Sequence, residues 1–163
     1  MTMGFEFSVI ETAADFEIAK NLFREYASSL NFDLGFQNFE GELNEIAIQY
    51  HRPFGGLILV MDDSTGEAIG CVGVRKFEGV IGELKRMNLQ DAYRGKGLGK
   101  ALLSQALFLS QKLGFEKLRL DTVSSMKSAI ALYQSMGFYE IAPYRYNPNE
   151  DTQYYEIDLL TRA

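Results

Sequence analysis

The chain has 163 residues, of which 47% are apolar and 23% are charged, and its formal net charge is −6. These proportions are close to the globular average and exclude collagen-like, low-complexity and disulfide-framework proteins. The acidic balance argues against general binding to nucleic acid or anionic lipid, because both attract proteins mainly through phosphate contacts with Lys and Arg.

The length favours one domain spanning residues 1–163. Cys71 is the only cysteine and has no partner for an internal disulfide, which is typical of a reducing compartment. The longest uninterrupted apolar run, Leu57 to Met61, is far shorter than the roughly 20 residues that a membrane-spanning helix needs. With no N-terminal signal pattern, we expect a cytoplasmic protein that binds neither membrane nor nucleic acid.

The first half of the chain passes from helical to extended patterns. Apolar residues at three- and four-residue steps predict a helix over Thr12–Leu30, with Thr12 as its N-cap. A shorter helical pattern over Phe39–Tyr50 ends before Pro53. Three strand patterns follow, separated by turn residues, which is typical of an antiparallel meander. These strands are Gly56–Asp62, Glu67–Lys76 and Val80–Leu89.

The second half interleaves helices and strands. Leucines three and four residues apart predict a helix over Gly97–Leu113, followed by a short strand over Lys117–Val123. We expect the next helix to be capped by Ser125 and to run through Met136, before a last hairpin around Asn147. This order predicts the α/β class, with a mixed, mostly antiparallel sheet flanked by helices on both faces.

The most informative stretch is Leu89–Leu102, LQDAYRGKGLGKAL, where a strand leads through a glycine-rich loop into a helix. Glycine lets the backbone approach a phosphate closely, and the first N–H groups of the helix point toward such an anion. Residues 85–100 also carry five basic residues against one acidic residue, a local charge of +4. We expect an anion site here, the alternative being a solvated basic turn. Its residues would be Arg94, Gly95, Lys96, Gly97, Leu98, Gly99 and Lys100.

Two common phosphate loops do not match this spacing. The G-x-G-x-x-G pattern requires glycine at position 100, which is Lys100, and the G-x-x-x-x-G-K-[ST] pattern requires Ser or Thr where Ala101 stands. The loop instead resembles the R/Q-x-x-G-x-G/A signature of the GNAT superfamily of N-acetyltransferases, with Arg94, Gly97 and Gly99 in the signature positions.

The resemblance to the GNAT superfamily extends over most of the chain. The order of elements agrees, and Ile130–Phe138, IALYQSMGF, is similar to the A-x-x-LY-x-x-x-GF segment of the family. It implies that the loop backbone binds the pyrophosphate of coenzyme A and that the strand ending at Leu89 holds the pantetheine arm. Met126 departs from the family pattern, because many relatives carry Asn there.

The resemblance also implies a proton acceptor for the amine that is acetylated. A lysine-like amine with a pKa of about 10.4 is almost wholly protonated at pH 7, so a base is useful. Glu83 lies eleven residues before Arg94, where some relatives keep a glutamate that accepts the amine proton. The alternative is that Glu83 only pairs with Lys85, two residues along on the same strand face.

Tyr133 stands where many GNAT relatives use tyrosine as a general acid. A phenol with a pKa near 10 is a weaker acid than a thiol with a pKa of about 8.5, so a hydrogen bond to the developing thiolate is favoured over early protonation. The alternative is that Tyr133 is a core residue, since it continues an apolar stripe with Met126 and Ile130.

The implied acceptor is a primary amine of a small molecule or a peptide. Aromatic residues in the early loop and near the C-terminus are expected to wall its pocket, with Asp33 or Glu40 facing the amine. Alternatively these residues pack within the fold or against a second subunit, so a homodimer is possible. The aromatic residues in question are Phe32, Phe36, Phe39, Tyr144, Tyr146, Tyr154 and Tyr155.

Two functional readings follow. The first is an acetyl-CoA-dependent N-acetyltransferase in which the amine attacks the thioester directly in a ternary complex. The second is a catalytically silent acyl-CoA-binding regulatory module, for which Met126 is the support; a nucleotide-phosphate binder unrelated to coenzyme A is a third possibility. A metal site is not expected, because His51 is the only histidine and has no Cys ligand nearby.

Overall fold

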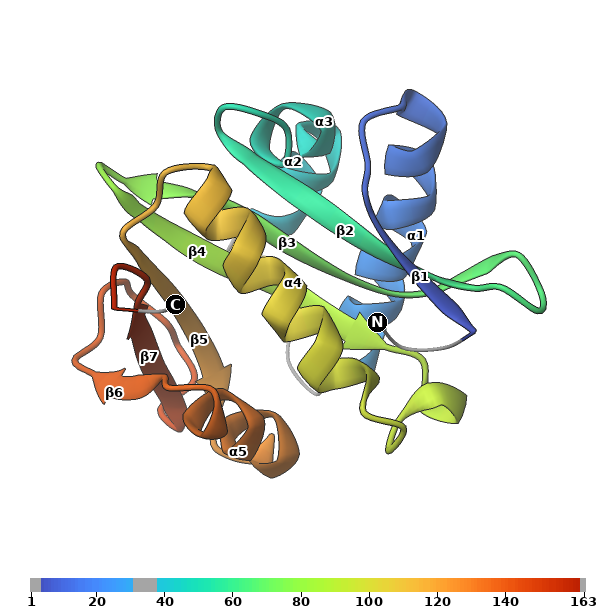
Figure 1. The fold of residues 1–163 in the computed structure, drawn as a ribbon. Helices are drawn as coiled ribbons and strands as arrows, with labels where there is room; N and C mark the ends of the chain where they lie inside the picture. The colour runs from blue at the N-terminus through green and yellow to red at the C-terminus, as the bar shows by residue number, and fades with distance from the viewer. Residues whose placement is uncertain (1–3, 31–37, 162–163) are drawn as a thin grey trace.

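The computed structural model describes residues 4–30 and 38–161. Its strands are β1 (Phe5–Val9), β2 (Gly55–Asp62), β3 (Glu67–Glu78), β4 (Ile81–Leu89), β5 (Lys117–Val123), β6 (Tyr139–Ile141) and β7 (Thr152–Asp158). Its helices are α1 (Ala13–Ser29), α2 (Phe39–Asn44), α3 (Ile46–Gln49), α4 (Leu98–Lys112) and α5 (Lys127–Ser135), with a short 3-10 helix at Asp91–Tyr93. Figure 1 shows their arrangement.

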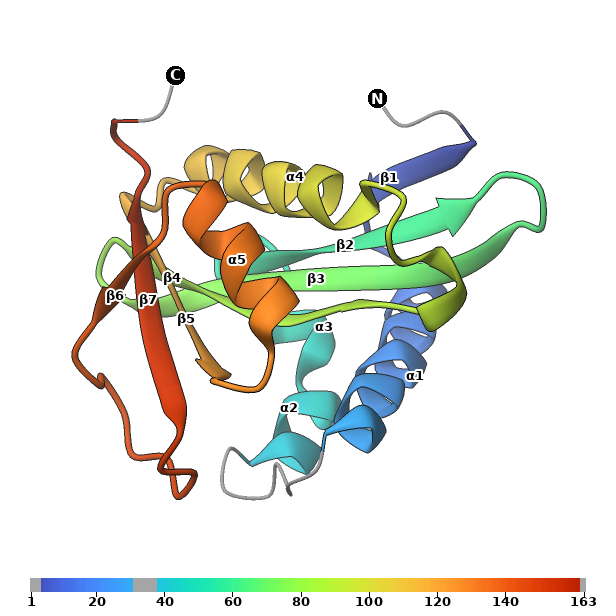
Figure 2. The ribbon, with the colours of Figure 1, turned by 90° about the horizontal axis from the view of Figure 1, so that it is seen from below.

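The strands form a seven-stranded sheet in the order β1-β2-β3-β4-β5-β7-β6. Every neighbouring pair is antiparallel except β4 and β5, which are parallel. Figure 2 shows α4 and α5 on one face and α1, α2 and α3 on the other. The predicted α/β class, a mixed, mostly antiparallel sheet flanked by helices on both faces, is therefore confirmed.

The parallel pair β4 and β5 is joined over only three residues on each strand. Pairing runs from Ile81 with Lys117 to Glu83 with Arg119 and then stops, so the two strands diverge (Figure 1). From Leu84 to Leu89, the edge of β4 that faces β5 has no ladder partner among the described strands. Unpaired backbone groups at this edge can bind a ligand.

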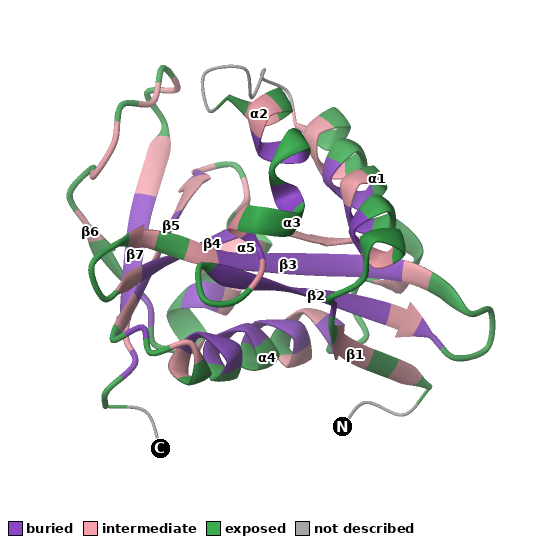
Figure 3. Ribbon diagram, turned by 90° about the horizontal axis from the view of Figure 1, so that it is seen from above, coloured by how far each residue is buried: buried purple, intermediate pink, exposed green. Residues whose placement is uncertain are grey.

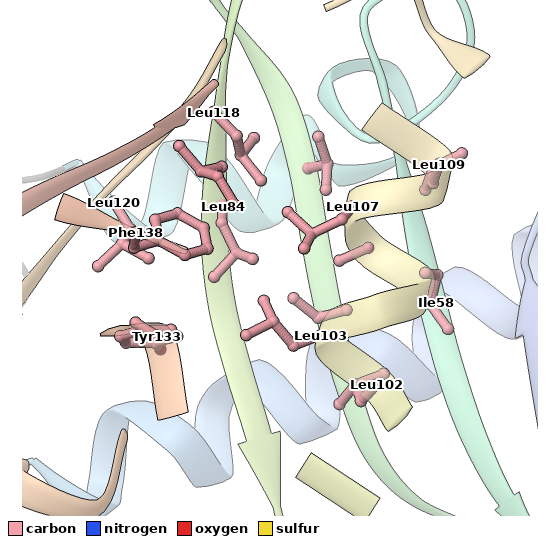
Figure 4. Packing of buried hydrophobic residues seen from close by; sticks show 14 of the residues in the cluster. Ile58, Leu84, Leu102, Leu103, Leu107, Leu109, Leu118, Leu120, Tyr133 and Phe138 are labelled. Carbon is pink, nitrogen blue, oxygen red and sulfur yellow. The ribbon is translucent and has the colours of Figure 1, made fainter. Parts of the chain in front are cut away.

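One hydrophobic core lies between the sheet and helices α4 and α5. The leucines spaced along α4 face β2, β3 and β4, while α5 contributes Tyr133 beside Phe138 and Leu120 (Figure 4). A second core joins α1, α2 and α3 to the opposite face. Figure 3 shows that β2 and the middle of β3, residues 69–74, lie between the two cores and are almost wholly buried.

Helix α1 begins and packs as its sequence predicts. The backbone N–H of Asp15 donates to the Thr12 hydroxyl at 3.1 Å, which confirms the predicted N-cap. Its buried residues are Phe16, Ala19, Leu22 and Phe23, and they follow a three- and four-residue spacing as predicted.

Three local features differ from the sequence prediction. The helical stretch before Pro53 is divided in two at Glu45, which caps both α2 and α3 with non-helical angles. The N-cap of α5 is Met126 rather than Ser125, and no side chain caps that helix. Strand β4 also contains a bulge, because Lys85 to Asn88 spans one residue more than the facing segment of β3, and Arg86 has a positive φ of 58°.

Candidate active site

The glycine loop leaves the first turn of α4 open to a ligand. Gly97 is the N-cap of the helix at φ 79°, a left-handed conformation that favours glycine, and it has no side chain with which to cap. The first helical hydrogen bond is donated by Ala101 to the Gly97 carbonyl, at 3.3 Å. The N–H groups of Leu98, Gly99 and Lys100 come before this first hydrogen bond, so they have no acceptor within the helix and are available to an anion.

Arg94 ties this loop to the end of β4. Its Nε donates to the Leu89 carbonyl at 3.1 Å and lies 3.4 Å from the Asp91 carboxylate. The side chain is 59% exposed, so its remaining guanidinium donors can bind phosphate oxygens.

A cavity of about 520 Å³ opens where β4 and β5 diverge, and we call it the β4–β5 cavity. It brings together several of the predicted site residues. These are Leu89, Arg94, Gly95, Gly99 and Tyr133, with Met126 beside them.

The remaining predicted loop residues lie outside this cavity. Gly97 and Lys100 line a separate hollow beside β1, and Leu98 is a buried core residue. The ammonium of Lys96 lies 5.9 Å from the centre of the Tyr93 ring. Gly97 therefore contributes through its backbone conformation. A Cβ added at this position would contact no atom of the described residues beyond its chain neighbours.

Tyr133 reaches the cavity from α5. Its ring is buried and lies 5.7 Å from that of Phe138. Burial raises the pKa of its hydroxyl, as do the nearby Tyr26 and Asp121, so the group stays protonated. Within the described part of the chain no hydrogen bond engages this hydroxyl, which leaves it able to donate to a group in the cavity.

Glu83, the candidate base, lies apart from Tyr133. It is buried on the opposite face of the sheet and lines another hollow of about 500 Å³. The Tyr144 hydroxyl donates to it at 2.8 Å, and Arg75 and Arg145 pair with it. Burial alone would raise its pKa, but Lys85, Arg145 and Arg75 outweigh burial and lower it. Glu83 is thus held ionised as the centre of an ion-pair network.

A second buried carboxylate, Glu42, was not expected from the sequence. The bulge in β4 directs Arg86 toward α2, where its guanidinium donates to Glu42 at 2.7 and 3.2 Å. The Tyr50 hydroxyl donates to the same carboxylate at 2.8 Å. Burial alone would raise the pKa of Glu42, but the hydrogen bonds and charge of Arg86 outweigh burial and lower it. The pair anchors α2 to the sheet beside the β4–β5 cavity, which Arg86 also lines.

Asp121 is a further residue that the sequence reasoning missed. It lies on β5, lines the β4–β5 cavity, and its side chain is only 10% exposed. The alternation in KLRLDTV was the available signal, since Leu118 and Leu120 face the core and the intervening residues face the other side.

The predicted aromatic wall is found only in part. Tyr144 and Tyr154 lie edge to face, 5.2 Å apart, on the face that bears Asp121. Tyr155 instead belongs to the core, and Tyr146 is 80% exposed. Glu40 is exposed, and Phe39 lies beneath the Arg86 guanidinium. The other predicted residues, Phe32, Asp33 and Phe36, lie outside the described residues.

The described ranges lack two classes of feature. No helix there is both long enough and apolar enough to cross a bilayer. Nor does any cluster of three or more His, Cys, Asp or Glu side chains there have an arrangement that would hold a metal ion.

Comparison with known proteins identifies the family. Residues 16–138 match the family model described as Acetyltransferase (GNAT) family. An uncharacterized N-acetyltransferase of Schizosaccharomyces pombe is 35% identical over 153 residues, which cover 93% of each chain.

Solved structures share the fold at lower identity. A GNAT-family acetyltransferase of Staphylococcus aureus has a TM-score of 0.75 at 21% identity, over 94% of this chain and 99% of that one. A Salmonella typhimurium protein solved with its cofactor acetyl-CoA has a TM-score of 0.70 at 16% identity, over 98% and 96% of the two chains. The sequence match and the shared fold lead to one conclusion: this chain belongs to the GNAT acetyltransferase family.

Proposed function

We propose that the chain is an acetyl-CoA-dependent N-acetyltransferase that acetylates a primary amine of a small molecule or peptide by direct attack in a ternary complex. One ammonium and one acetyl-CoA would give one N-acetyl product, one coenzyme A and one proton. The observation that carries this proposal is the β4–β5 cavity, because it joins the glycine loop to the Tyr133 hydroxyl in one continuous space.

The residues of the cavity fit coenzyme A in two respects. The uncapped first turn of α4 and the exposed Arg94 guanidinium offer donors to a diphosphate. The unpaired edge of β4 beyond Glu83 offers backbone N–H and C=O groups to an extended chain that carries amides. Bound there, acetyl-CoA supplies an acetyl group activated as a thioester.

Tyr133 is the residue proposed to assist departure of the thiolate. Its hydroxyl has a raised pKa and is unengaged by the described residues, and Tyr133 lines the cavity. A hydrogen bond donated to sulfur would stabilise the negative charge that develops as the carbon–sulfur bond breaks. Glu83, whose pKa is lowered by its arginine partners, is better suited to holding Arg145 and Tyr144 in place than to accepting a proton.

Thiol release from acetyl-CoA with a panel of primary amines tests this proposal. We expect release of free coenzyme A that depends on the amine, with an equal amount of N-acetyl product detected by mass spectrometry. Calorimetry with acetyl-CoA should be run on the same sample. Cofactor binding without release for any amine would instead support a silent acyl-CoA-binding module, and competition by ATP for the bound coenzyme A would support a nucleotide binder.

A further inference from the structure

The Asp121 side chain is 10% exposed, and one of its two carboxylate oxygens is buried without a hydrogen-bond donor from the described residues. Its Oδ2 is shielded from solvent and has no partner within hydrogen-bonding distance. The nearest cation is Arg145, whose Nε is 4.0 Å from Oδ2 and is itself without a hydrogen bond. A buried carboxylate that lacks donors is unfavourable, so its persistence calls for a ligand that supplies them.

The neighbouring ion pairs do not satisfy Asp121. Three carboxylates and three guanidiniums form this network, those of Glu42, Glu83 and Asp121 and those of Arg75, Arg86 and Arg145. Glu42 and Glu83 each have closer cationic contacts than Asp121. Arg86 donates to Glu42 at 2.7 Å, and the Arg145 guanidinium donates directly to Glu83. Arg145 is therefore engaged mainly by Glu83. Lys85 and Asp121 also attract each other electrostatically, and burial lowers the pKa of this lysine to about 8.

The position of Asp121 suits an acceptor rather than the cofactor. Asp121 and Tyr133 line the same cavity but belong to opposite faces of the sheet, since Leu120 faces the α5 core and Asp121 faces the other way. Tyr154 pairs with Asp121 across the strands, and Tyr26 of α1 also lines the cavity. Aromatic rings beside a carboxylate form surroundings that favour an organic cation.

We propose that Asp121 binds the ammonium group of the acceptor, which deepens and rests on the N-acetyltransferase function proposed above. A primary ammonium carries three N–H donors, and the carboxylate lacks donors. The substrate class is then a primary amine that arrives as a cation, held across the cavity from the Tyr133 hydroxyl. Anionic acceptors would be repelled by the same carboxylate.

Binding calorimetry on protein saturated with coenzyme A tests this without turnover. Phenethylammonium is the cationic probe, and aniline, which shares its phenyl ring and is uncharged near neutral pH, is the neutral probe. Asp121→Asn keeps the shape and removes the charge, and we expect phenethylammonium affinity to fall by about tenfold or more because a charge-assisted hydrogen bond is lost. Affinity for aniline should not change. Asp158→Asn is the matched control, because the new amide oxygen can still accept from the Leu160 N–H.

Thermal stability separates a binding role from a structural one. Because the Oδ2 atom of Asp121 is buried without a donor, the Asp121→Asn protein should melt at the same temperature or higher. The proposal is overturned if the wild type binds no phenethylammonium. It is also overturned if Asp121→Asn lowers the affinity for both probes equally, or if the variant loses thermal stability together with affinity. Failure of the proposed function would give a different result: no amine would cause thiol release from acetyl-CoA. The affinity for phenethylammonium could still be measured in that case, so the two failures can be distinguished.

Discussion

Gly97 and Gly99 stand two residues apart in the glycine loop, and we expect them to respond in opposite ways to alanine. Gly97 has a φ of 79°, where a side chain costs about 1–2 kcal/mol. Gly99 is in the first turn of α4, and an added Cβ would lie 3.5 Å from Leu132, an ordinary contact. Alanine is favoured over glycine within a helix by about 0.5–1 kcal/mol. Gly97→Ala should therefore destabilise the protein and Gly99→Ala should stabilise it.

These free energies translate into measurable shifts. At about 2–4 °C per kcal/mol for a chain of this size, Gly97→Ala should lower Tm by about 2–8 °C and Gly99→Ala should raise it by about 1–4 °C. That fall in Tm assumes that the free Gly97→Ala protein keeps the strain; any part that the loop relieves must be restored on ligand binding and appears instead as a rise in the Kd for coenzyme A. The full cost of about 1–2 kcal/mol corresponds to a rise of about 5- to 30-fold, so the fall in Tm and the rise in Kd share this cost, while the Kd of Gly99→Ala should stay unchanged.

Scanning calorimetry and titration calorimetry with coenzyme A provide the two readouts. The reasoning is refuted if Gly97→Ala melts and binds as the wild type does, since the left-handed turn would then have no role. It is also refuted if Gly99→Ala gains stability but loses affinity, because the ligand would then occupy space that the structure leaves to a methyl group.

Three other predictions concern separate parts of the molecule. Tyr133→Phe should lower turnover by about 10- to 100-fold, because a hydrogen bond to a charged group is lost. The affinity for coenzyme A, measured by calorimetry, should stay unchanged. Unaltered turnover would show that Tyr133 takes no part in the reaction. Glu42→Gln should destabilise the fold by about 3–5 kcal/mol near neutral pH, because the buried Arg86 guanidinium would lose the negative charge that lies 2.7 Å from it. The Glu42 pKa is lowered by folding, so this carboxylate stabilises the protein above its unfolded pKa and the contribution is lost as pH falls through the folded value. The difference in unfolding free energy between wild type and variant, from denaturant titrations, should narrow in acid, and a constant difference would contradict the sign. Cys71 is buried with a raised pKa, so a thiol reagent should modify it only when denaturant unfolds the chain; modification of the native protein would contradict its burial.

Regular elements were predicted well because their signals are local. The leucine spacing before Gly114 identified α4, and alternation identified β5 with the bounds that the structure shows. Thr12 was recognised as a cap from its position before an apolar stripe. Each of these signals lies within one element, so no knowledge of its neighbours in the fold was needed.

Only some of the predicted site residues lie together in the structure, because contacts between elements decide where each side chain lies. Gly99 and Tyr133 reach one cavity as the family motifs imply. Glu83 has the expected position in the sequence, but its carboxylate forms ion pairs with Arg75 on β3 and with Arg145 near the C-terminus. These three residues are distant in the sequence, and no spacing rule predicts that they meet. The bulge that directs Arg86 to Glu42 likewise depends on the register between β3 and β4.

A crystal structure with acetyl-CoA bound tests the central claim most directly. The account predicts pyrophosphate against the first turn of α4 and Arg94, and a thioester in the β4–β5 cavity with its sulfur in hydrogen-bonding reach of the Tyr133 hydroxyl. A cofactor bound at another surface, or a thioester separated from Tyr133 by the core, would contradict it.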